Sequence, residues 1–161
     1  MIIREIEEKD NQKMEQIIKR SLESFGLDIP GTAYFDPQLS HLAEFYKNEP
    51  NAKYWVAVDE EGHVVGGVGI GPFGQENDVG ELQKLYVIPE AQGKGLAKKL
   101  MEVALDFVRE HYTYCYLETS RKLKVANRLY SKLGFKELDK PIEGSEHGTM
   151  DKWYIKEFKS K

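Results

Sequence analysis

The sequence lacks several features that would indicate particular classes of protein. It contains one cysteine, Cys115, among 161 residues, so neither an internal disulfide framework nor a cysteine-rich zinc site can be built. Cys115 lies in an apolar, aromatic run over residues 114–117, which favours a buried packing role over a reactive one. There is no internal repeat, low-complexity tract or domain linker. We therefore expect one domain over residues 1–161, with a full hydrophobic core.

Long apolar runs are absent as well. No stretch approaches the roughly 18 apolar residues that a membrane span needs, and residues 1–5 lack the basic and then apolar layout of a signal peptide. We therefore expect a cytoplasmic protein that has no membrane partner. The net charge of −4 argues against general binding to nucleic acid, and it is compatible with cationic or amine-bearing partners.

The clearest feature that is present is a glycine loop over residues 89–97. It lies between an extended apolar run and an amphipathic segment that continues to about His111, a pattern that predicts a strand, a loop and a helix start. Gly93 and Gly95 allow the backbone to approach a bulky anion, and a helix start offers unpaired N–H groups with the positive end of the helix dipole behind them. The loop has the form of a phosphate cradle.

Two common phosphate-binding patterns do not fit this loop. A nucleotide-hydrolysing loop needs Gly-x-x-x-x-Gly-Lys-Ser/Thr, and the sequence contains no such string. A dinucleotide-binding loop needs a third glycine at the position where this chain has Lys98. Because a lone Gly-x-Gly is weak evidence, the ligand has to be inferred from the surrounding residues.

Apolar periodicity predicts the other elements. Strands are expected over residues 2–6, 54–58, 63–70, 79–87, 114–119, 135–138 and 150–158. Helices are expected over about residues 10–22, 39–46, 96–111 and 123–133. Residues 79–119 form a strand, a crossover helix and a second strand, so we expect these two strands to be parallel.

Three features near this unit bear on a binding site. Strict alternation along residues 79–87 predicts one face with Glu81, Gln83, Leu85 and Val87 and another with Leu82, Lys84 and Tyr86. Four glycines within residues 66–71 make a flat strand of the kind that a ligand or a second backbone approaches, although a bulge explains them equally well. The aromatic loop over residues 25–35 is either a wall of a substrate pocket or folded onto the core.

Two motifs then narrow the ligand. Residues 92–97 match the pattern Gln/Arg-x-x-Gly-x-Gly/Ala, preceded by Val-x-Pro at residues 87–89, and residues 127–135 match Asn-x-x-Ala/Leu-Tyr-x-x-x-Gly-Phe. In this order and spacing the motifs resemble those of the GCN5-related N-acetyltransferase (GNAT) superfamily. The resemblance is strongest over residues 81–134, about a third of the chain.

The resemblance implies an α/β (α+β) fold of GNAT type. Its sheet is mixed, twisted and mostly antiparallel, with about seven strands, about four flanking helices and a central, splayed pair of parallel strands. The implied cosubstrate is acetyl-coenzyme A (acetyl-CoA), and no metal is implied. The residues implied to bind acetyl-CoA are Leu85, Tyr86, Val87, Gln92, Gly93, Lys94, Gly95, Leu96, Ala97, Lys98, Asn127 and Tyr130. Ordinary solvated helix surface is the alternative for Lys94 and Lys98.

The implied reaction assigns roles to a few side chains. Acetyl transfer to a primary amine needs a neutral amine, stabilisation of the oxyanion and a proton for the departing thiolate. By resemblance, Glu81 is the general base, acting directly or through water, and its alternatives are binding of a cationic substrate or an ion pair. Tyr130 is the acid by resemblance, with core packing as its alternative. Glu118 is the alternative carboxylate. We expect direct attack in a ternary complex, because no residue stands out as a covalent nucleophile.

The acceptor is expected to be a primary amine on a small or amino-acid-like molecule. Candidate substrate-binding residues are Phe25, Tyr34, Glu118 and His147. The alternatives are acetylation of a protein N-terminus or lysine, and a non-catalytic acetyl-CoA sensor. The presence of both Glu81 and Tyr130 favours an enzyme, since a pure binding module needs neither. A homodimer, common among relatives, is compatible with the sequence, which specifies no interface.

Overall fold

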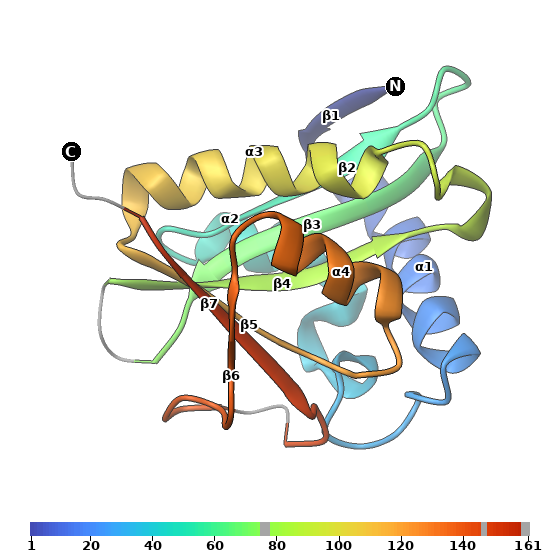
Figure 1. Ribbon diagram of the computed structural model, residues 1–161. Coiled ribbons are helices and arrows are strands. Elements are labelled where there is room, and N and C mark those ends of the chain that lie inside the picture. The colour runs from blue at the N-terminus through green and yellow to red at the C-terminus, as the bar shows by residue number, and fades with distance from the viewer. Residues whose placement is uncertain (75–77, 146–147, 159–161) are drawn as a thin grey trace.

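The computed structural model describes residues 1–74, 78–145 and 148–158. Within them, seven strands form one mixed sheet in the order β1-β2-β3-β4-β5-β7-β6 (Figure 1). The strands are β1 (Ile2–Glu5), β2 (Lys53–Val58), β3 (Val64–Pro72), β4 (Val79–Val87), β5 (Tyr114–Thr119), β6 (Lys136–Leu138) and β7 (Lys152–Glu157). The α-helices are α1 (Asn11–Ser24), α2 (Leu42–Asn48), α3 (Leu96–His111) and α4 (Lys124–Lys132). The expected fold class is confirmed.

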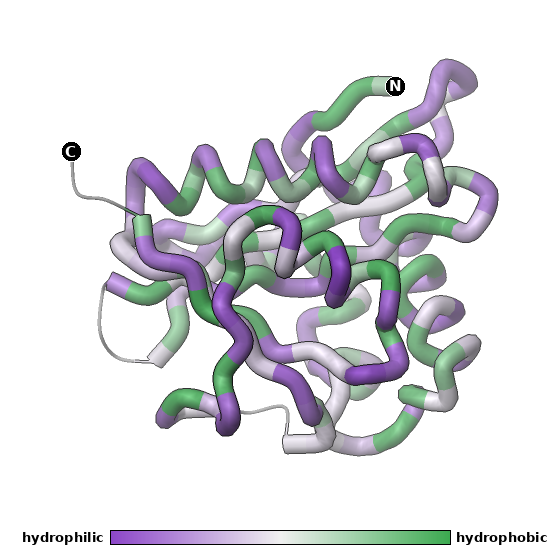
Figure 2. Tube along the Cα trace, in the orientation of Figure 1, coloured by the Kyte–Doolittle hydropathy of each residue, from purple (hydrophilic) through white to green (hydrophobic). Residues whose placement is uncertain are grey.

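Two hydrophobic cores cover opposite faces of the sheet. Consecutive residues of β2 divide between them, with Trp55 and Ala57 in the core under α3 and Tyr54 and Val56 in the core under α1. Figure 2 shows the hydrophobic positions of α3 turned toward the sheet and the hydrophilic ones away from it. No helix among the described residues has the length and apolar character needed to cross a membrane.

The central strand β4 contains a bulge at Lys84. The backbone of Lys84 has a φ of 51°, in the left-handed region that only a few non-glycine residues adopt. Against β3, Gln83 pairs with Gly69 and Tyr86 pairs with Gly67, so one residue of β3 faces two of β4. One strand therefore carries an extra residue, which is the definition of a β-bulge.

The bulge overturns the strict alternation predicted for β4. Leu82, Leu85 and Val87 pack in or against the α3 core, whereas Tyr86 packs against the α1 core. The grouping of Leu85 and Val87 with Glu81 was wrong, because an extra residue reverses the faces of every position that follows it.

β4 and β5 form the only parallel pair in the described sheet, and the pairing is short. It covers three residues of each strand, from Val79 with Tyr114 to Glu81 with Tyr116. On its other edge, β5 pairs antiparallel with β7 along its whole length, from Tyr114 to Thr119. β4 and β5 then diverge, and α4 lies beside the opening (Figure 1). The splayed central pair expected from the resemblance is present.

The loop between α1 and α2 is tied to this bulge. Leu27 and Leu39 anchor it in the α1 core, at 4% and 2% exposure. Between them, Asp36 Oδ2 lies 2.8 Å from Nζ of Lys84, whose side chain is 4% exposed. The main-chain oxygen of Lys84 accepts a hydrogen bond from the hydroxyl of Tyr54 at 2.7 Å. The ion pair joins a loop to a central strand far from it in the chain.

We expect Asp36→Ala to lower the free energy of unfolding by about 3 kcal/mol, because it leaves the buried ammonium of Lys84 without its carboxylate. The double variant Asp36→Leu with Lys84→Met should recover most of this loss, since apolar groups of similar size replace both charges. Urea unfolding measures both. Additive losses in the double variant would show that the pair is not coupled.

Candidate active site

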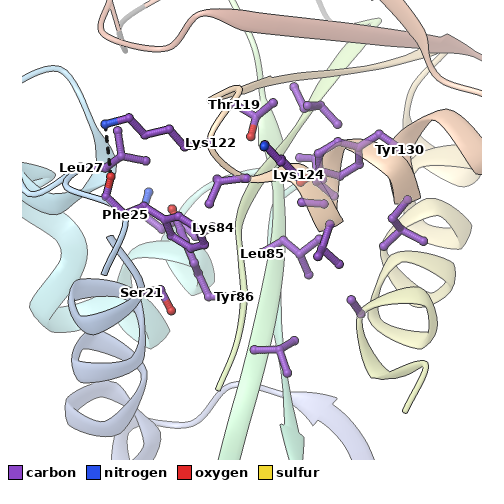
Figure 3. A pocket seen from close by; sticks show the side chains of 18 of the residues that line it. Ser21, Phe25, Leu27, Lys84, Leu85, Tyr86, Thr119, Lys122, Lys124 and Tyr130 are labelled. Atoms are coloured by element: carbon purple, nitrogen blue, oxygen red, sulfur yellow. Dashed lines mark hydrogen bonds between the residues drawn. The ribbon is translucent and has the colours of Figure 1, made fainter. Parts of the chain in front are cut away.

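A cleft of about 500 Å³ opens where β4 and β5 diverge. Leu82 and residues 84–87 of β4 form one wall, and α4 with the segment that precedes it forms another. Figure 3 shows Leu85 on the side of β4 that faces Tyr130, and Lys84 and Tyr86 on the side that faces α1. The residues predicted for the site that line this cleft are Phe25, Leu85, Tyr86, Val87, Gln92, Ala97, Glu118 and Tyr130.

The glycine loop lies at the edge of this cleft. Gly93 and Gly95 have φ values of 79° and 77°, which favour glycine, and no described atom lies within 4 Å of where a side chain would begin at either. The helix α3 begins directly after Gly95. Gln92 Nε2 donates to the main-chain oxygen of Val87 at 2.9 Å, which holds the loop against the end of β4. The loop thus offers open space at a helix start, as a bulky anion requires.

The other predicted loop residues differ in exposure. Leu96 is buried in the α3 core, at 4% exposure. Lys94 and Lys98 are exposed and do not line the cleft. Residues 93–96 nevertheless lie between Gln92 and Ala97, which do line it.

Asn127 shapes the start of α4. Its Nδ2 donates to the main-chain oxygens of Ser120 and Leu123, both at 2.9 Å. Its Oδ1 is buried and has no hydrogen-bond partner among the described residues. Asn127 does not line the cleft wall. An unpartnered buried acceptor is costly, so a donor from a ligand would satisfy it.

Tyr130, one turn further along α4, belongs both to the core and to the cleft. It is 5% exposed, and its ring lies 5.6 Å from that of Tyr154 and 6.0 Å from that of Phe135. Burial raises the pKa of the Tyr130 phenol well above its ordinary value, so the group keeps its proton throughout the neutral range. Cys115 is fully buried, and burial likewise raises the pKa of its thiol, in agreement with the expected packing role.

A second, smaller cavity of about 160 Å³ adjoins the cleft on the α1 side of the sheet. The residues that line both spaces are Leu82, Lys84, Tyr86, Glu118 and Met150. Four charged side chains line the smaller cavity, where Asp36, Glu81 and Glu118 contribute carboxylates and Lys84 one ammonium. In the described part of the chain, no three His, Cys, Asp or Glu side chains are grouped as a metal ion would require. We call this space the acidic cavity.

Glu81 and Glu118 reach the acidic cavity from the two diverging strands. Oε1 of Glu81 accepts a hydrogen bond from Gln83 Nε2 at 2.8 Å. Oε2 of Glu118 accepts one from the hydroxyl of Tyr116 at 2.8 Å, and the same hydroxyl accepts from the amide of Ile142 at 3.2 Å. Burial, and then the hydrogen bond to Glu118, raises the pKa of Tyr116, so its hydroxyl stays a donor. The structure brings both candidate carboxylates together.

Of the remaining candidate substrate-binding residues, one lines the cleft and one does not. Phe25 lines the cleft and is 42% exposed, whereas Tyr34 lines neither space and donates its hydroxyl to Glu23 at 2.8 Å. The aromatic loop is therefore partly a cleft wall and partly folded onto the core. His147 lies outside the described residues.

The sequence did not point to Asp36 or Met150 as residues of the site, and it placed Lys84 on the face opposite to Glu81. Turn formers around Asp36 indicated only a loop. The bulge that moves Lys84 has no signal in the apolar pattern.

Comparisons with known proteins find relatives among the acetyltransferases. A model of the acetyltransferase (GNAT) family matches residues 13–135. The uncharacterized N-acetyltransferase YjgM of Escherichia coli K12 is 41% identical over 149 residues, which cover 91% of this chain and 88% of that protein. The N-acetylaspartate synthetase of Xenopus tropicalis is 32% identical over 122 residues, which cover 73% of this chain but only 44% of that protein.

Solved structures share the fold along nearly the whole chain. An acetyltransferase of the GNAT family from Staphylococcus aureus Mu50 has a TM-score of 0.86 at 22% identity and covers 98% of this chain and 99% of its own. The PaiA N-acetyltransferase from Thermoplasma acidophilum, in complex with coenzyme A, has a TM-score of 0.73 at 21% identity, with 98% of each chain covered. The family model and the 41% identity to an N-acetyltransferase show that this chain belongs to the acetyltransferase (GNAT) family, with acetyl-CoA as its cosubstrate.

Proposed function

We propose that this chain transfers an acetyl group from acetyl-CoA to the primary amine of a small acceptor, by direct attack in a ternary complex. The observation that carries the proposal is the meeting of two spaces at Lys84, Tyr86 and Glu118. The larger cleft suits the cosubstrate, and the acidic cavity suits an amine. The reaction would take place where the two meet.

The cleft would hold the cosubstrate through main-chain groups. Amides of residues 93–97 bind the diphosphate, supported by the dipole of α3, which begins at Leu96. Beyond Glu81, β4 is no longer paired with β5, and its backbone on that edge pairs with the pantetheine arm as it would with an added strand. Asn127 holds the start of α4 beside the ligand, and Lys94 and Lys98 add charge near the diphosphate. When bound, acetyl-CoA supplies a thioester whose carbonyl carbon the amine attacks.

A carboxylate in the acidic cavity has to receive the proton of the amine. An alkyl amine has a pKa near 10.4 and is mostly protonated at neutral pH, so it cannot attack before it loses a proton. We assign this role to Glu81, which lines the acidic cavity beside Lys84 and Tyr86. Glu118, on the other strand, binds the amine or a second polar group of the acceptor and is the alternative base.

Tyr130 would supply the proton that the departing thiolate needs. It lines the cleft, and the raised pKa keeps its phenol protonated at neutral pH. Burial among Phe135 and Tyr154 also fixes its ring, so the hydroxyl needs little reorganisation when the thiolate forms.

The charge of the acidic cavity favours a cationic acceptor. It holds three carboxylates and one ammonium within about 160 Å³, and the ammonium is already paired with Asp36. An acidic acceptor would meet like charges, which cost several kcal/mol at close range. Synthesis of N-acetylaspartate belongs to relatives of which this chain spans less than half the length. We propose a small amine with a second positive group.

The acid role predicts that Tyr130→Phe lowers kcat by about 100-fold or more, the usual size of a general acid's contribution, and leaves the Kd of acetyl-CoA within about twofold. Thiol release and calorimetry measure the two quantities. Tyr154→Phe is a matched control, because this buried neighbour lines neither space and its hydroxyl accepts from Lys152 Nζ. An unchanged kcat in Tyr130→Phe would remove the acid role. Binding of acetyl-CoA without thiol release for any amine would favour a sensor.

The acceptor class can be tested with three amines of equal chain length, namely 1,4-diaminobutane, n-butylamine and 4-aminobutanoate. We expect kcat/KM to fall in this order, by about tenfold or more between the first and the last, because the distal group changes from cationic to neutral to anionic. Glu118→Gln should reduce the advantage of the diamine, whereas Glu102→Gln, on the exposed face of α3, should not. Preference for 4-aminobutanoate would indicate instead that Lys84 binds a carboxylate.

A further inference from the structure

A chain of hydrogen bonds reaches Glu81 from α2. The hydroxyl of Tyr46, on α2, donates to Oε1 of Gln83, and Nε2 of Gln83 donates to Oε1 of Glu81 at 2.8 Å. With its oxygen engaged by Tyr46, the amide of Gln83 is fixed with its N–H groups toward Glu81. The chain links a helix to the central strand on the face that holds the acidic cavity.

The far end of this chain is rigid. Tyr46 is 3% exposed, and its ring packs against Phe45 at 5.2 Å and Tyr54 at 5.3 Å between centroids. Burial, and then the charges of Glu81 and Asp36, raises the pKa of Tyr46 well above its ordinary value. The hydroxyl therefore remains a donor, and the packed rings hold it toward Gln83.

The glycines of β3 leave the space that this chain occupies. In the register of the two strands, Gly69 faces Gln83 and Gly71 faces Glu81. A side chain at Gly71 would begin 3.0 Å from Oε1 and 3.1 Å from Nε2 of Gln83, and one at Gly69 would begin 2.8 Å from the hydroxyl oxygen of Tyr46. These distances are shorter than ordinary contacts, so two of the glycines in β3 make room for the polar side chains opposite.

We propose that Gln83, held by Tyr46, is a positioning residue that orients the carboxylate of Glu81 for proton removal from the acceptor amine. The inference rests on the proposed role of Glu81 as the base. A carboxylate that accepts a fixed hydrogen bond loses rotational freedom, and a base oriented in advance needs less reorganisation when the proton moves. The glycine-rich strand and the α2 tyrosine thereby act on the reaction without touching the substrate.

The test is a double-mutant cycle between Gln83→Met and Glu81→Gln. Methionine has nearly the length of glutamine but makes neither hydrogen bond, so Gln83→Met should lower kcat by about tenfold with both KM values within about twofold. In the Glu81→Gln background, the same substitution should have no further effect on kcat, because it acts through the carboxylate. Gln83→Met leaves the buried hydroxyl of Tyr46 without an acceptor, which can lower the stability of the protein. If it does, the cycle is repeated with Tyr46→Phe added to both Gln83→Met variants, because that substitution removes the unpaired hydroxyl.

Gly71→Ala provides a second route that leaves all three side chains in place. The three atoms nearest to the position that the methyl group would take all belong to the side chain of Gln83, and the backbone at Gly71 is not left-handed. We expect a loss of about threefold in kcat that disappears in the Glu81→Gln background. Tyr112→Phe is the control, because it removes a buried hydroxyl that donates to the main-chain oxygen of Asn51 at 2.6 Å, outside both spaces.

Two results would overturn the positioning role. One is a folded Gln83→Met variant with unchanged kcat, and the other is an undiminished loss in the Glu81→Gln background, which would indicate a general structural effect. If Glu81→Gln itself keeps the wild-type kcat, the base assignment of the proposed function fails, and the positioning role fails with it.

Discussion

The arrangement of the site depends on the bulge at Lys84. Backbone groups of a strand need partners. β4 pairs with β3 on either side of the bulge, and at the bulge the main-chain oxygen of Lys84 accepts from the hydroxyl of Tyr54 instead. On its other side, β4 pairs with β5 only as far as Glu81. The bulge turns Lys84 and Tyr86 toward the α1 face, and the divergence from β5 opens the cleft. The bulge and the divergence together place the cleft and the acidic cavity next to each other.

Burial has both structural and chemical consequences here. Tyr130 packs against two other aromatic rings and lines the cleft, so the packing that stabilises the fold also keeps its phenol protonated. The polar groups around the acidic cavity are held in a similar way. Glu81 accepts from Gln83, Glu118 accepts from Tyr116, and Lys84 is paired with Asp36. Charged groups in a small cavity need such partners, because an unpaired one would cost several kcal/mol.

Local patterns in the sequence predicted most of the elements well. The bounds of β4 and β5 agree with the expected residues 79–87 and 114–119. Residues 37–48 are a 3₁₀ turn followed by α2, whereas one short helix was expected. The contacts of the loop between α1 and α2 were harder to predict, because Lys84, the partner of its Asp36, lies far away in the chain.

By itself, the sequence determined the order of the elements, the glycine loop before α3 and the family to which these motifs point. Each of these features is encoded by residues that are close together in the sequence, where hydrophobic periodicity and backbone preference determine the local structure. The tertiary structure decided which side chains meet in the acidic cavity. Asp36, Glu81 and Glu118 come from three separate segments, and their meeting depends on a bulge and a strand divergence. Both arise from pairing between strands, which a local pattern does not encode.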